Sequence, residues 1–497
     1  MDDFWNEFLN WWPYLIGIVN FILIAVFLPQ VLMYKAESTS AVAWGLVIVF
    51  LPLIGVGLFA LFGYQHISRR VRQKRRHKEL YRLNSPGRRR RQGASRVGNQ
   101  TPDAEPLSDL CPRMVHLAGE FDAQDVTPGN QIDFYYEGKS AYDAMLLAIR
   151  QAKHHIHLQT FIFQPDETGD DFLAALTERA RQGIEVRLLY DAVGSHRLRP
   201  RKLEGLRAAG GRCCVFLPIS LLRRRMQINL RNHRKIQVVD GQIGFIGGLN
   251  VGNEYLGKDP RFGFWRDTHL RLQGPVVADL QRVFAEDWDF AAAEQLIPED
   301  NPEKCVYLQT QDAQGPFPAQ VIDSGPDRDL KGIREIYHAA ILQAERRVWI
   351  ASPYFVPDAG LRDALRLAGY KGVDVRFLGQ FRPDKLIPQY AARFFWGEVL
   401  SAGVKVYQYT RGMIHAKVVL VDDDWASVGT ANLDNRSLHL NFEVNCLIYS
   451  RRAVAELAAQ FERDLETAIR LECGVYARRP FAGRLLENAC RLLSPVL

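Results

Sequence analysis

Two long charge-free stretches dominate the hydropathy pattern at the start of the chain. No Asp, Glu, Lys or Arg occurs between Glu7 and Lys35, and "YLIGIVNFILIAVFLPQVLM" at residues 14–33 has the length that spans a bilayer core. A second charge-free run covers residues 41–64, and aromatic residues lie near the ends of both runs, as they do at membrane interfaces. Two such runs so close together are unusual in a soluble protein. We therefore predict a two-helix transmembrane hairpin over residues 1–68.

Positive charge is concentrated in one block directly after the second run. Residues 69–91 hold twelve Lys and Arg and a single acid, whereas the whole chain of 497 residues carries only +7 and residues 92–497 carry about −1. Because positive charge near a membrane end stays in the cytoplasm, we expect the N-terminus and the body to be cytoplasmic. The block either sets this topology alone or also binds anionic lipid head groups. With the polar stretch that follows, residues 69–108 form a juxtamembrane segment and linker.

From about Leu110 the pattern changes to alternating strand and helix periods that are written twice. Three stretches recur at offsets of 192, 189 and 182 residues: "QAKHHIHLQTFIFQPD" with "QAERRVWIASPYFVPD", "IEVRLLYD" with "VDVRFLGQ", and "NHRKIQVVDGQIGFIGGLN" with "IHAKVVLVDDDWASVGTAN". A unit of this length excludes a solenoid. We predict an α/β fold with two domains, 109–300 and 301–497. Each is a mixed sheet flanked by helices, and the two are related by pseudo-twofold duplication.

Each copy of the third stretch carries a His and a Lys two residues apart in a strand-like pattern. Side chains alternate faces along a strand, so His233 and Lys235 share one face, as do His415 and Lys417 on theirs. A single pair of this kind is weak evidence, because it is more often an ordinary surface or interface pair. Two copies, each followed by a glycine-rich turn, favour a functional site.

The aspartates that close the two copies, Asp240 and Asp422, lie at odd spacing from their histidines. Strand parity turns them to the opposite face, so we expect them to fix the strand end and the following turn. A catalytic histidine still needs a carboxylate on its second ring nitrogen. Asp267 follows the first histidine by 34 residues and Glu443 follows the second by 28, both in strand-like stretches. We assign Asp267 to the first histidine and Glu443 to the second.

Each copy ends on an Asn turn with small residues. Asn250 and Asn432 can supply neutral donors, Thr430 can add a hydroxyl, and Gly248 lets the backbone approach a ligand closely. Paired histidines, lysines and asparagines form a donor-rich cationic pocket, which suits a phosphate group. One histidine can attack phosphorus while the other protonates the leaving oxygen, and fixed donors can stabilise the developing charge without a metal.

Three other features have simpler readings. The acids at 422–424 could hold magnesium, although a turn between strands is the simpler reading. Seven cysteines without a CxxC pair argue against a zinc site or a disulfide framework. The C-terminal stretch 476–497 has apolar residues on one helical side, which could rest on a bilayer. We favour packing of that side on the body.

The doubled HxKxxxxD pattern with its Asn turns resembles the phospholipase D superfamily. The match extends along nearly the whole chain to its bacterial cardiolipin synthases, through "RLLYDAVGS", "GGLNVGNEY", "WRDTHLRLQGP", "LNFEVN" and "RLLSPVL". The resemblance implies condensation of two phosphatidylglycerols into cardiolipin and glycerol at a bacterial inner membrane, through a phosphohistidine and with neither cofactor nor metal. It implies phosphatidylglycerol and anionic lipid as partners, with a homodimer left open. Carried onto this sequence, it places His233, Lys235, Asn250, His415, Lys417 and Asn432 in the site. With the aspartates that close the two motifs, our predicted catalytic set is His233, Lys235, Asp240, His415, Lys417 and Asp422. The family commonly has Ser at position 430, and Thr430 keeps the hydroxyl.

Three rival functions use the same motifs. A hydrolase would use water as the acceptor, and the motifs separate it poorly from a transferase. A membrane-tethered nuclease would need a basic body, whereas residues 92–497 are nearly neutral. A non-catalytic scaffold would not need both half-sites, and both are intact.

Overall fold

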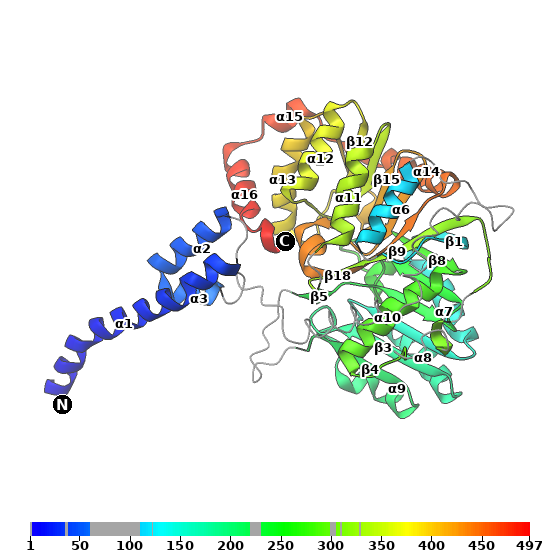
Figure 1. The fold of residues 1–497 in the computed structure, drawn as a ribbon, viewed down its shortest axis with the longest axis horizontal. Helices are drawn as coiled ribbons and strands as arrows, with labels where there is room; N and C mark the ends of the chain where they lie inside the picture. Colours follow the sequence, from blue (N-terminus) through cyan, green and yellow to red (C-terminus); the bar gives the residue numbers. More distant parts are fainter. Residues whose placement is uncertain are drawn as a thin grey trace. The chain divides into compact units, whose positions relative to one another are not determined.

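The N-terminal helices form a unit of their own. The computed structural model describes residues 2–34, 38–59, 110–121, 123–218, 230–298, 305–308, 311–327 and 330–497. Helix α1 (Asp2–Tyr34) is continuous, and its segment Trp11–Met33 is the one helix of crossing length and apolarity among the described residues. The first predicted membrane helix is therefore present (Figure 1). The predicted basic segment and linker, 69–108, lies outside the described residues.

The second apolar run does not form the single long helix predicted for it. It gives α2 (Ser38–Phe50) and α3 (Pro52–Leu58), which are separated at Leu51. Proline at the first position of α3 has no N–H to continue the ladder of α2. The chain then folds back, because the rings of Trp44 and Phe59 lie 5.4 Å apart, whereas fifteen residues of straight helix would separate them by about 22 Å. The described part of the run, up to residue 59, is thus a short helical hairpin, and residues 60–64 lie outside the described part.

The body contains the predicted duplication as two sheets with the same strand order. Most strands are buried along their length, as in sheets covered on both faces. The first sheet runs β1 (Thr127–Glu137), β8 (Phe264–Gln273), β7 (Ile243–Gly247), β6 (Ile236–Val239), β2 (His155–Thr160), β3 (Glu185–Asp191), β4 (Arg212–Phe216). The second runs β9 (Phe317–Ser324), β18 (Asn441–Ile448), β16 (Trp425–Gly429), β15 (Val418–Val421), β10 (Arg347–Ala351), β12 (Asp374–Gln380), β13 (Lys405–Tyr409), with β19 (Ala468–Arg470) at its edge. In both sheets parallel and antiparallel pairs occur together, so the mixed α/β prediction is confirmed.

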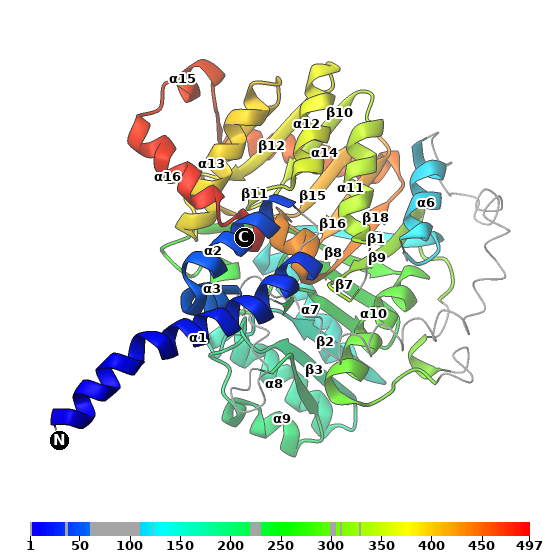
Figure 2. The same cartoon turned by 60° about the vertical axis from the view of Figure 1, so that its left-hand side comes forward.

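Helices cover each sheet (Figures 1 and 2). The repeated sequence also gives two of these helices matching N-terminal residues. The first half carries α7 (Gly138–Gln151), α8 (Glu167–Arg181), the short α9 (Glu204–Ala208) and α10 (Val276–Ala292). The second carries α11 (Gly332–Gln343), α12 (Ala359–Tyr370), α13 (Leu386–Leu400), α14 (Arg451–Glu466), α15 (Cys473–Ala477) and α16 (Phe481–Arg491). The repeated "PD" supplies matching N-caps: Asp166 accepts from the Gly169 N–H and Asp358 from the Leu361 N–H, both at 3.0 Å.

The two halves are joined by strands that pair across them. β1 pairs with β9 along the central seam. Two short strands add parallel pairs: β5 (Arg231–Asn232) of the first half lies on β18, and β14 (Gly412–Ile414) of the second lies on β8. In addition, α6 (Leu110–Glu120) precedes β1 in the chain but packs against α11, with Met114 and Ala118 in the core of the second half. The domain boundary near residue 300 stays a prediction.

Candidate active site

Both His–Lys pairs lie where a strand is interrupted, not inside a strand as predicted. His233 and Lys235 fall between β5 and β6, and His415 and Lys417 fall between β14 and β15. Each lysine ammonium donates to the carbonyl of its own histidine, at 2.7 Å for Lys235. The pairs are nevertheless buried, with no member more than 8% exposed. Because neither pair lies within a strand, the alternation of side chains along a strand does not apply to it. The argument by which we placed each His and Lys on one face of a strand was therefore wrong.

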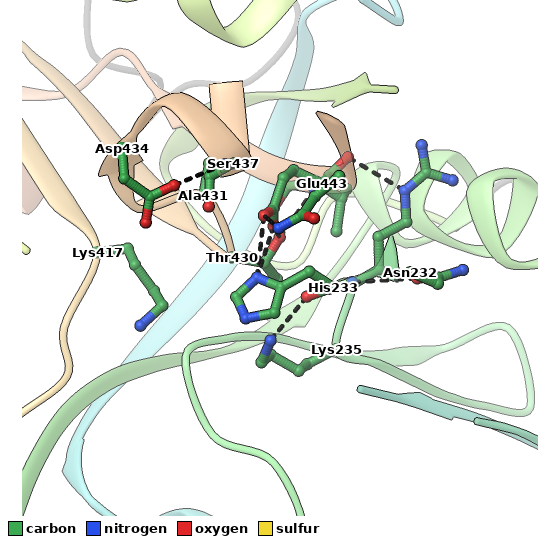
Figure 3. Close-up of polar contacts among 12 residues, drawn as sticks. Asn232, His233, Lys235, Lys417, Thr430, Ala431, Asp434, Ser437 and Glu443 are labelled. Carbon is green, nitrogen blue, oxygen red and sulfur yellow. Dashed lines mark hydrogen bonds and ion pairs between the residues drawn. The ribbon is translucent and has the colours of Figure 1, made fainter. Parts of the chain in front are cut away.

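The carboxylates that hold the histidines are the predicted ones, but they are exchanged between the halves. Nδ1 of His233 lies 2.9 Å from Glu443, and Nδ1 of His415 lies 2.8 Å from Asp267 (Figure 3 shows the first pair). The assignment of each carboxylate to the histidine of its own copy was therefore wrong. Each half-site is assembled from both halves of the chain.

The short cross-half strands explain the exchange. β5 runs directly into His233 and pairs with the start of β18, two residues before Glu443. β14 runs into His415 and pairs with the start of β8, where Asp267 follows. The backbone N–H of His233 donates to the Phe442 carbonyl at 2.9 Å, and that of His415 to the Arg266 carbonyl at 2.7 Å. Because the backbones are pinned in this way, each imidazole meets the carboxylate of the opposite copy.

Thr430 and Gly248, predicted to bind phosphate, instead support the carboxylates. The Thr430 hydroxyl donates to Glu443 at 2.6 Å, so its one proton is already used (Figure 3). Gly248 occupies the matching place in the first copy, and its N–H donates to the Thr268 carbonyl at 3.2 Å. A Cβ at this glycine would lie 2.0 Å from an oxygen of Asp267. Glycine is needed there for the carboxylate to fit, and both residues position the histidine partners.

The two asparagines differ from each other. The Asn250 carboxamide bridges the Ile162 N–H and the Tyr255 hydroxyl, which ties it to the protein. The Asn432 carboxamide oxygen is buried and has no hydrogen-bond partner among the described residues. A buried acceptor without a partner is costly unless a ligand satisfies it. Of the pair, Asn432 is the better placed to meet a substrate hydroxyl or amide donor.

Asp240 and Asp422 lie away from the histidine nitrogens and hold the strand ends, as predicted. Both have positive φ, 55° and 50°, the left-handed turn conformation that Asp tolerates. The Asp240 carboxylate accepts the backbone N–H groups of residues 153–155 at 2.7–3.0 Å. Asp422 accepts those of residues 345–347 in the same way. These contacts indicate a structural role for two residues counted in the catalytic set.

The acids at 422–424, considered above as a possible magnesium site, are likewise structural in their contacts. Asp423 forms ion pairs with Arg346 and Arg347 rather than facing its neighbours as a metal site would. Among the residues that the structure describes, no group of three or more His, Cys, Asp and Glu side chains is arranged to hold a metal ion.

Arg234 is a site residue that sequence reasoning missed. It lies between His233 and Lys235, is 1% exposed, and forms ion pairs with Asp287 at 2.8 Å and Asp323 at 2.6 Å. Its guanidinium also donates to the carbonyl of Glu443 at 3.1 Å. The available signal was the contrast with Ala416 at the matching place in the second copy. Arg234 ties the first motif to α10, β9 and β18.

Aromatic rings close the sides of the site. The centroid of the Phe161 ring lies 4.9 Å from that of the His233 ring and 5.5 Å from the Lys235 ammonium. Trp265 lies 5.3 Å from His415, and Tyr255 packs on Trp265 at 4.8 Å. These rings exclude water and lower the local dielectric, which strengthens charge interactions with a bound anion.

Burial shifts the pKa values of the site in a consistent direction. Burial and then Lys235 hold the pKa of His233 well below its usual range, and burial and then Lys417 lower the pKa of His415 to about 4. Burial also lowers the pKa of Lys235 to about 7 and that of Lys417 to about 8. Both imidazoles are thus neutral near pH 7, and neutral imidazole is the nucleophilic form.

The two carboxylates differ in the same respect. Burial raises the pKa of Glu443 to about 7, against the opposing charge of Lys235. Burial raises the pKa of Asp267, but His415, Lys417 and the Thr268 N–H together outweigh burial, so the pKa of Asp267 is lowered. An ionised Asp267 favours the imidazolium form of His415. The half-sites are therefore alike in geometry and unequal in proton affinity.

Comparisons with known proteins agree along most of the chain. The family model described as "Cardiolipin synthase, PLD-like domain" matches residues 145–288 and 337–465. A cardiolipin synthase of Geobacillus kaustophilus is 40% identical over 461 residues, which cover 93% of this chain and 89% of the relative. The major cardiolipin synthase of Bacillus subtilis is 37% identical over 496 residues, covering 96% of this chain and 98% of the relative.

Solved structures show the same fold. A phosphatidylserine synthase of Haemophilus influenzae superposes with a TM-score of 0.61 at 16% identity, over 78% of this chain and all of that one. At this identity the likeness concerns the fold of the body alone.

Proposed function

The chain belongs to the cardiolipin synthases built on phospholipase D-like domains, and on that premise we propose that it transfers a phosphatidyl group from one phosphatidylglycerol to another. The products are cardiolipin and glycerol, and the reaction is reversible. The observation that carries the proposal is the pair of buried histidines, each held at Nδ1 by a carboxylate of the opposite half, with both lysines beside them.

His233 is the nucleophile in this proposal. Glu443 occupies its Nδ1, so Nε2 carries the lone pair that attacks phosphorus. The bond from phosphorus to the glycerol oxygen breaks as the new P–N bond forms. His415, as imidazolium, gives its proton to the departing oxygen and glycerol leaves. Lys235 and Lys417 neutralise the phosphate oxygens.

The second step reverses these roles at His415. The hydroxyl of a second phosphatidylglycerol gives its proton to the neutral His415 and attacks phosphorus, the P–N bond breaks, and cardiolipin leaves. His415 then holds the proton it needs for the reverse reaction. Burial and then Lys417 lower the pKa of His415 to about 4. A bound phosphate anion opposes both effects, so the proton enters the site together with the substrate.

The asymmetry of the carboxylates supports this division of labour. The acid must be an imidazolium, and Asp267, whose pKa is lowered by His415, is the carboxylate that stabilises one. Glu443, whose pKa burial raises, favours the imidazolium form of His233 less, which leaves His233 neutral and able to attack. Glu443 is in turn fixed by Thr430, which keeps Nε2 of His233 aimed at the substrate.

We also propose that the body lies on the cytoplasmic face of a bacterial inner membrane. The basic block at 69–91 supports this side. Because α2 and α3 fold back on each other, we propose that α1 alone crosses the membrane. A single crossing puts the N-terminus on the face of the membrane opposite the body. Labelling of a cysteine introduced in place of Asp3, in cells with an intact inner membrane, tests this: protection from an impermeant reagent contradicts it. A homodimer stays a prediction.

The product distinguishes transfer from hydrolysis. Purified full-length protein is incubated with labelled phosphatidylglycerol vesicles in excess chelator, and lipids and water-soluble products are separated. We expect cardiolipin and glycerol in equal amounts. Phosphatidic acid as the main lipid product would replace the proposal with a hydrolase, and His233→Ala and His415→Ala are the matched inactive controls.

A further inference from the structure

Helix α16 carries its apolar side outward. Phe481, Leu485 and Leu492 recur on one helical face and are 73%, 60% and 73% exposed, and Leu486 beside them is 45% exposed. This is the apolar side of the C-terminal stretch that the sequence led us to place against the body. In the structure this side is exposed, and the helix packs on α13 (Figures 1 and 2).

The inward side of the same helix is charged. Glu487 is 2% exposed and forms ion pairs with Arg393 at 3.1 Å and Arg479 at 2.6 Å. The Arg491 guanidinium lies 4.4 Å from the centroid of the Phe394 ring on α13. These contacts fix α16 to the body through charged side chains. A helix on the surface of a water-soluble protein has the opposite arrangement, with its apolar side buried and its charged side exposed.

Such an inverted helix suits an apolar neighbour. Moving a large apolar side chain out of water is favourable in free energy. A helix that buries its ion pairs and exposes Phe and Leu is therefore stabilised most when the acyl chains of a membrane cover its exposed side. Arg478 and Arg484 are exposed beside the apolar face, where they can meet anionic head groups. Charge and apolar surface together point to a bilayer that contains anionic lipid.

A second exposed apolar stretch lies at the start of α13. The first turn of α13 exposes Leu386 and Ile387, at 65% and 47%. They follow Lys385, an exposed cation whose charge helps to lower the pKa of His233. Arg393 and Phe394 lie near the middle of α13, so the contacts of Glu487 and Arg491 place the last turns of α16 there, about two turns from Leu386 and Ile387.

The tail after α16 connects directly to the second motif. The Ser494 carbonyl accepts the side-chain amide of Asn435 at 3.0 Å, and the Leu497 carbonyl accepts the backbone N–H of Arg436 at 2.7 Å. Asn435 is three residues from Asn432, whose carboxamide oxygen has no partner among the described residues. The tail that follows α16 thus contacts the segment that carries Asn432.

We propose that Leu386, Ile387, Phe481, Leu485, Leu486 and Leu492 form a ridge that inserts into the acyl region of an anionic bilayer and opens the active site to lipid within it. The ridge would let the glycerophosphate head groups of donor and acceptor reach the histidines while their acyl chains stay in the membrane. This role in substrate entry rests on the proposed function, whereas insertion itself does not.

Photo-crosslinking identifies what covers the ridge. Benzoylphenylalanine replaces Leu485 in the full-length protein, which is reconstituted into phosphatidylglycerol–phosphatidylethanolamine vesicles and illuminated. The matched control carries it in place of Leu147, which is 52% exposed on α7. We expect lipid adducts by mass spectrometry at position 485 and at least tenfold fewer at position 147. A cross-linked dimer, a cross-link to residues 1–69, or equal lipid labelling at both positions would each overturn the proposal.

Kinetics separate membrane insertion from a defect of folding or chemistry. The double variant Leu485→Glu, Leu492→Glu is compared with Leu147→Glu on phosphatidylglycerol vesicles and on short-chain phosphatidylglycerol dispersed as monomers. We expect the ratio of vesicle to monomer turnover to fall about tenfold in the double variant and to stay unchanged in the control. An equal loss on both substrates would overturn the proposal. If the wild-type protein makes no cardiolipin, the proposed function fails, while the cross-linking result still decides insertion.

Discussion

The exchange of carboxylates between the halves makes a quantitative prediction about which residues are energetically coupled. His233 and Glu443 are 2.9 Å apart and both lie in the interior, as do His415 and Asp267 at 2.8 Å. A hydrogen bond to a charged group contributes about 1.5–3 kcal/mol net to stability. Residues that share no contact couple by less than about 0.5 kcal/mol. The crossed pairs and the pairs within each copy should therefore differ severalfold in coupling energy.

Double-mutant cycles on stability measure this coupling without requiring activity. Glu443→Gln is combined with His233→Ala and, separately, with His415→Ala, and Asp267→Asn is combined with the same two. Urea unfolding of full-length protein in detergent micelles, followed by near-ultraviolet circular dichroism at pH 8.5, gives each free energy. We expect about 1.5–3 kcal/mol for Glu443 with His233 and for Asp267 with His415, and under about 0.5 kcal/mol for the other combinations.

The pH dependence of these couplings adds a second check. Burial raises the pKa of Glu443 to about 7, so this carboxylate takes up a proton as the pH falls from 8.5 to 6. Its bond to His233 then becomes a neutral one, worth about 0.5–1.5 kcal/mol. The pKa of Asp267 is lowered, so its coupling to His415 should not weaken over this range. Equal coupling within and across the copies, or the larger pH dependence at Asp267, would refute the reasoning.

Three further predictions concern the residues around the histidines and the core. Asp240→Asn removes the charge that accepts three backbone N–H groups, so the free energy of unfolding should fall by about 2–3 kcal/mol while kcat of the folded protein stays within twofold; a lost kcat at unchanged stability would make Asp240 catalytic. Thr430→Val removes the hydroxyl that donates to Glu443 and should lower kcat about tenfold on phosphatidylglycerol vesicles, with Thr430→Ser restoring it; an unaffected Val variant would dismiss the positioning role. Asp279 is only 8% exposed, and burial, opposed by Arg282, raises its pKa to about 7 against 3.8 for an exposed Asp. Its ionisation therefore destabilises the fold progressively as the pH rises from about 4 to 7. Asp279→Asn should therefore raise the free energy of unfolding by about 2–4 kcal/mol at pH 8 and by little at pH 4, and the opposite trend would contradict the assignment.

The duplication and the identity of the site residues could be predicted from the sequence, because each half repeats its own local patterns. The roles of Asp240 and Asp422 followed from their position at a strand end before a turn. The partner of each histidine could not be predicted in this way. It depends on β5 and β14, strands of two and three residues whose pairing across the halves leaves no periodicity to detect.

Two other features could not be predicted from local sequence patterns. The run at 41–64 has the composition of a membrane helix, but Pro52 divides it and Phe59 returns to Trp44. The C-terminal stretch has clear amphipathicity, yet periodicity alone gives no direction for the apolar side. In the structure the ion pairs of Glu487 decide that direction.

The site of covalent attachment tests the central claim most directly. Wild-type protein is mixed with labelled phosphatidylglycerol, quenched within one turnover under conditions that preserve phosphohistidine, and digested for mass spectrometry. We predict a phosphatidyl group on His233 and none on His415, and we expect it on Nε2 because Glu443 occupies Nδ1. Attachment to His415, to Nδ1 of His233, or cardiolipin formation with no covalent species would contradict the account.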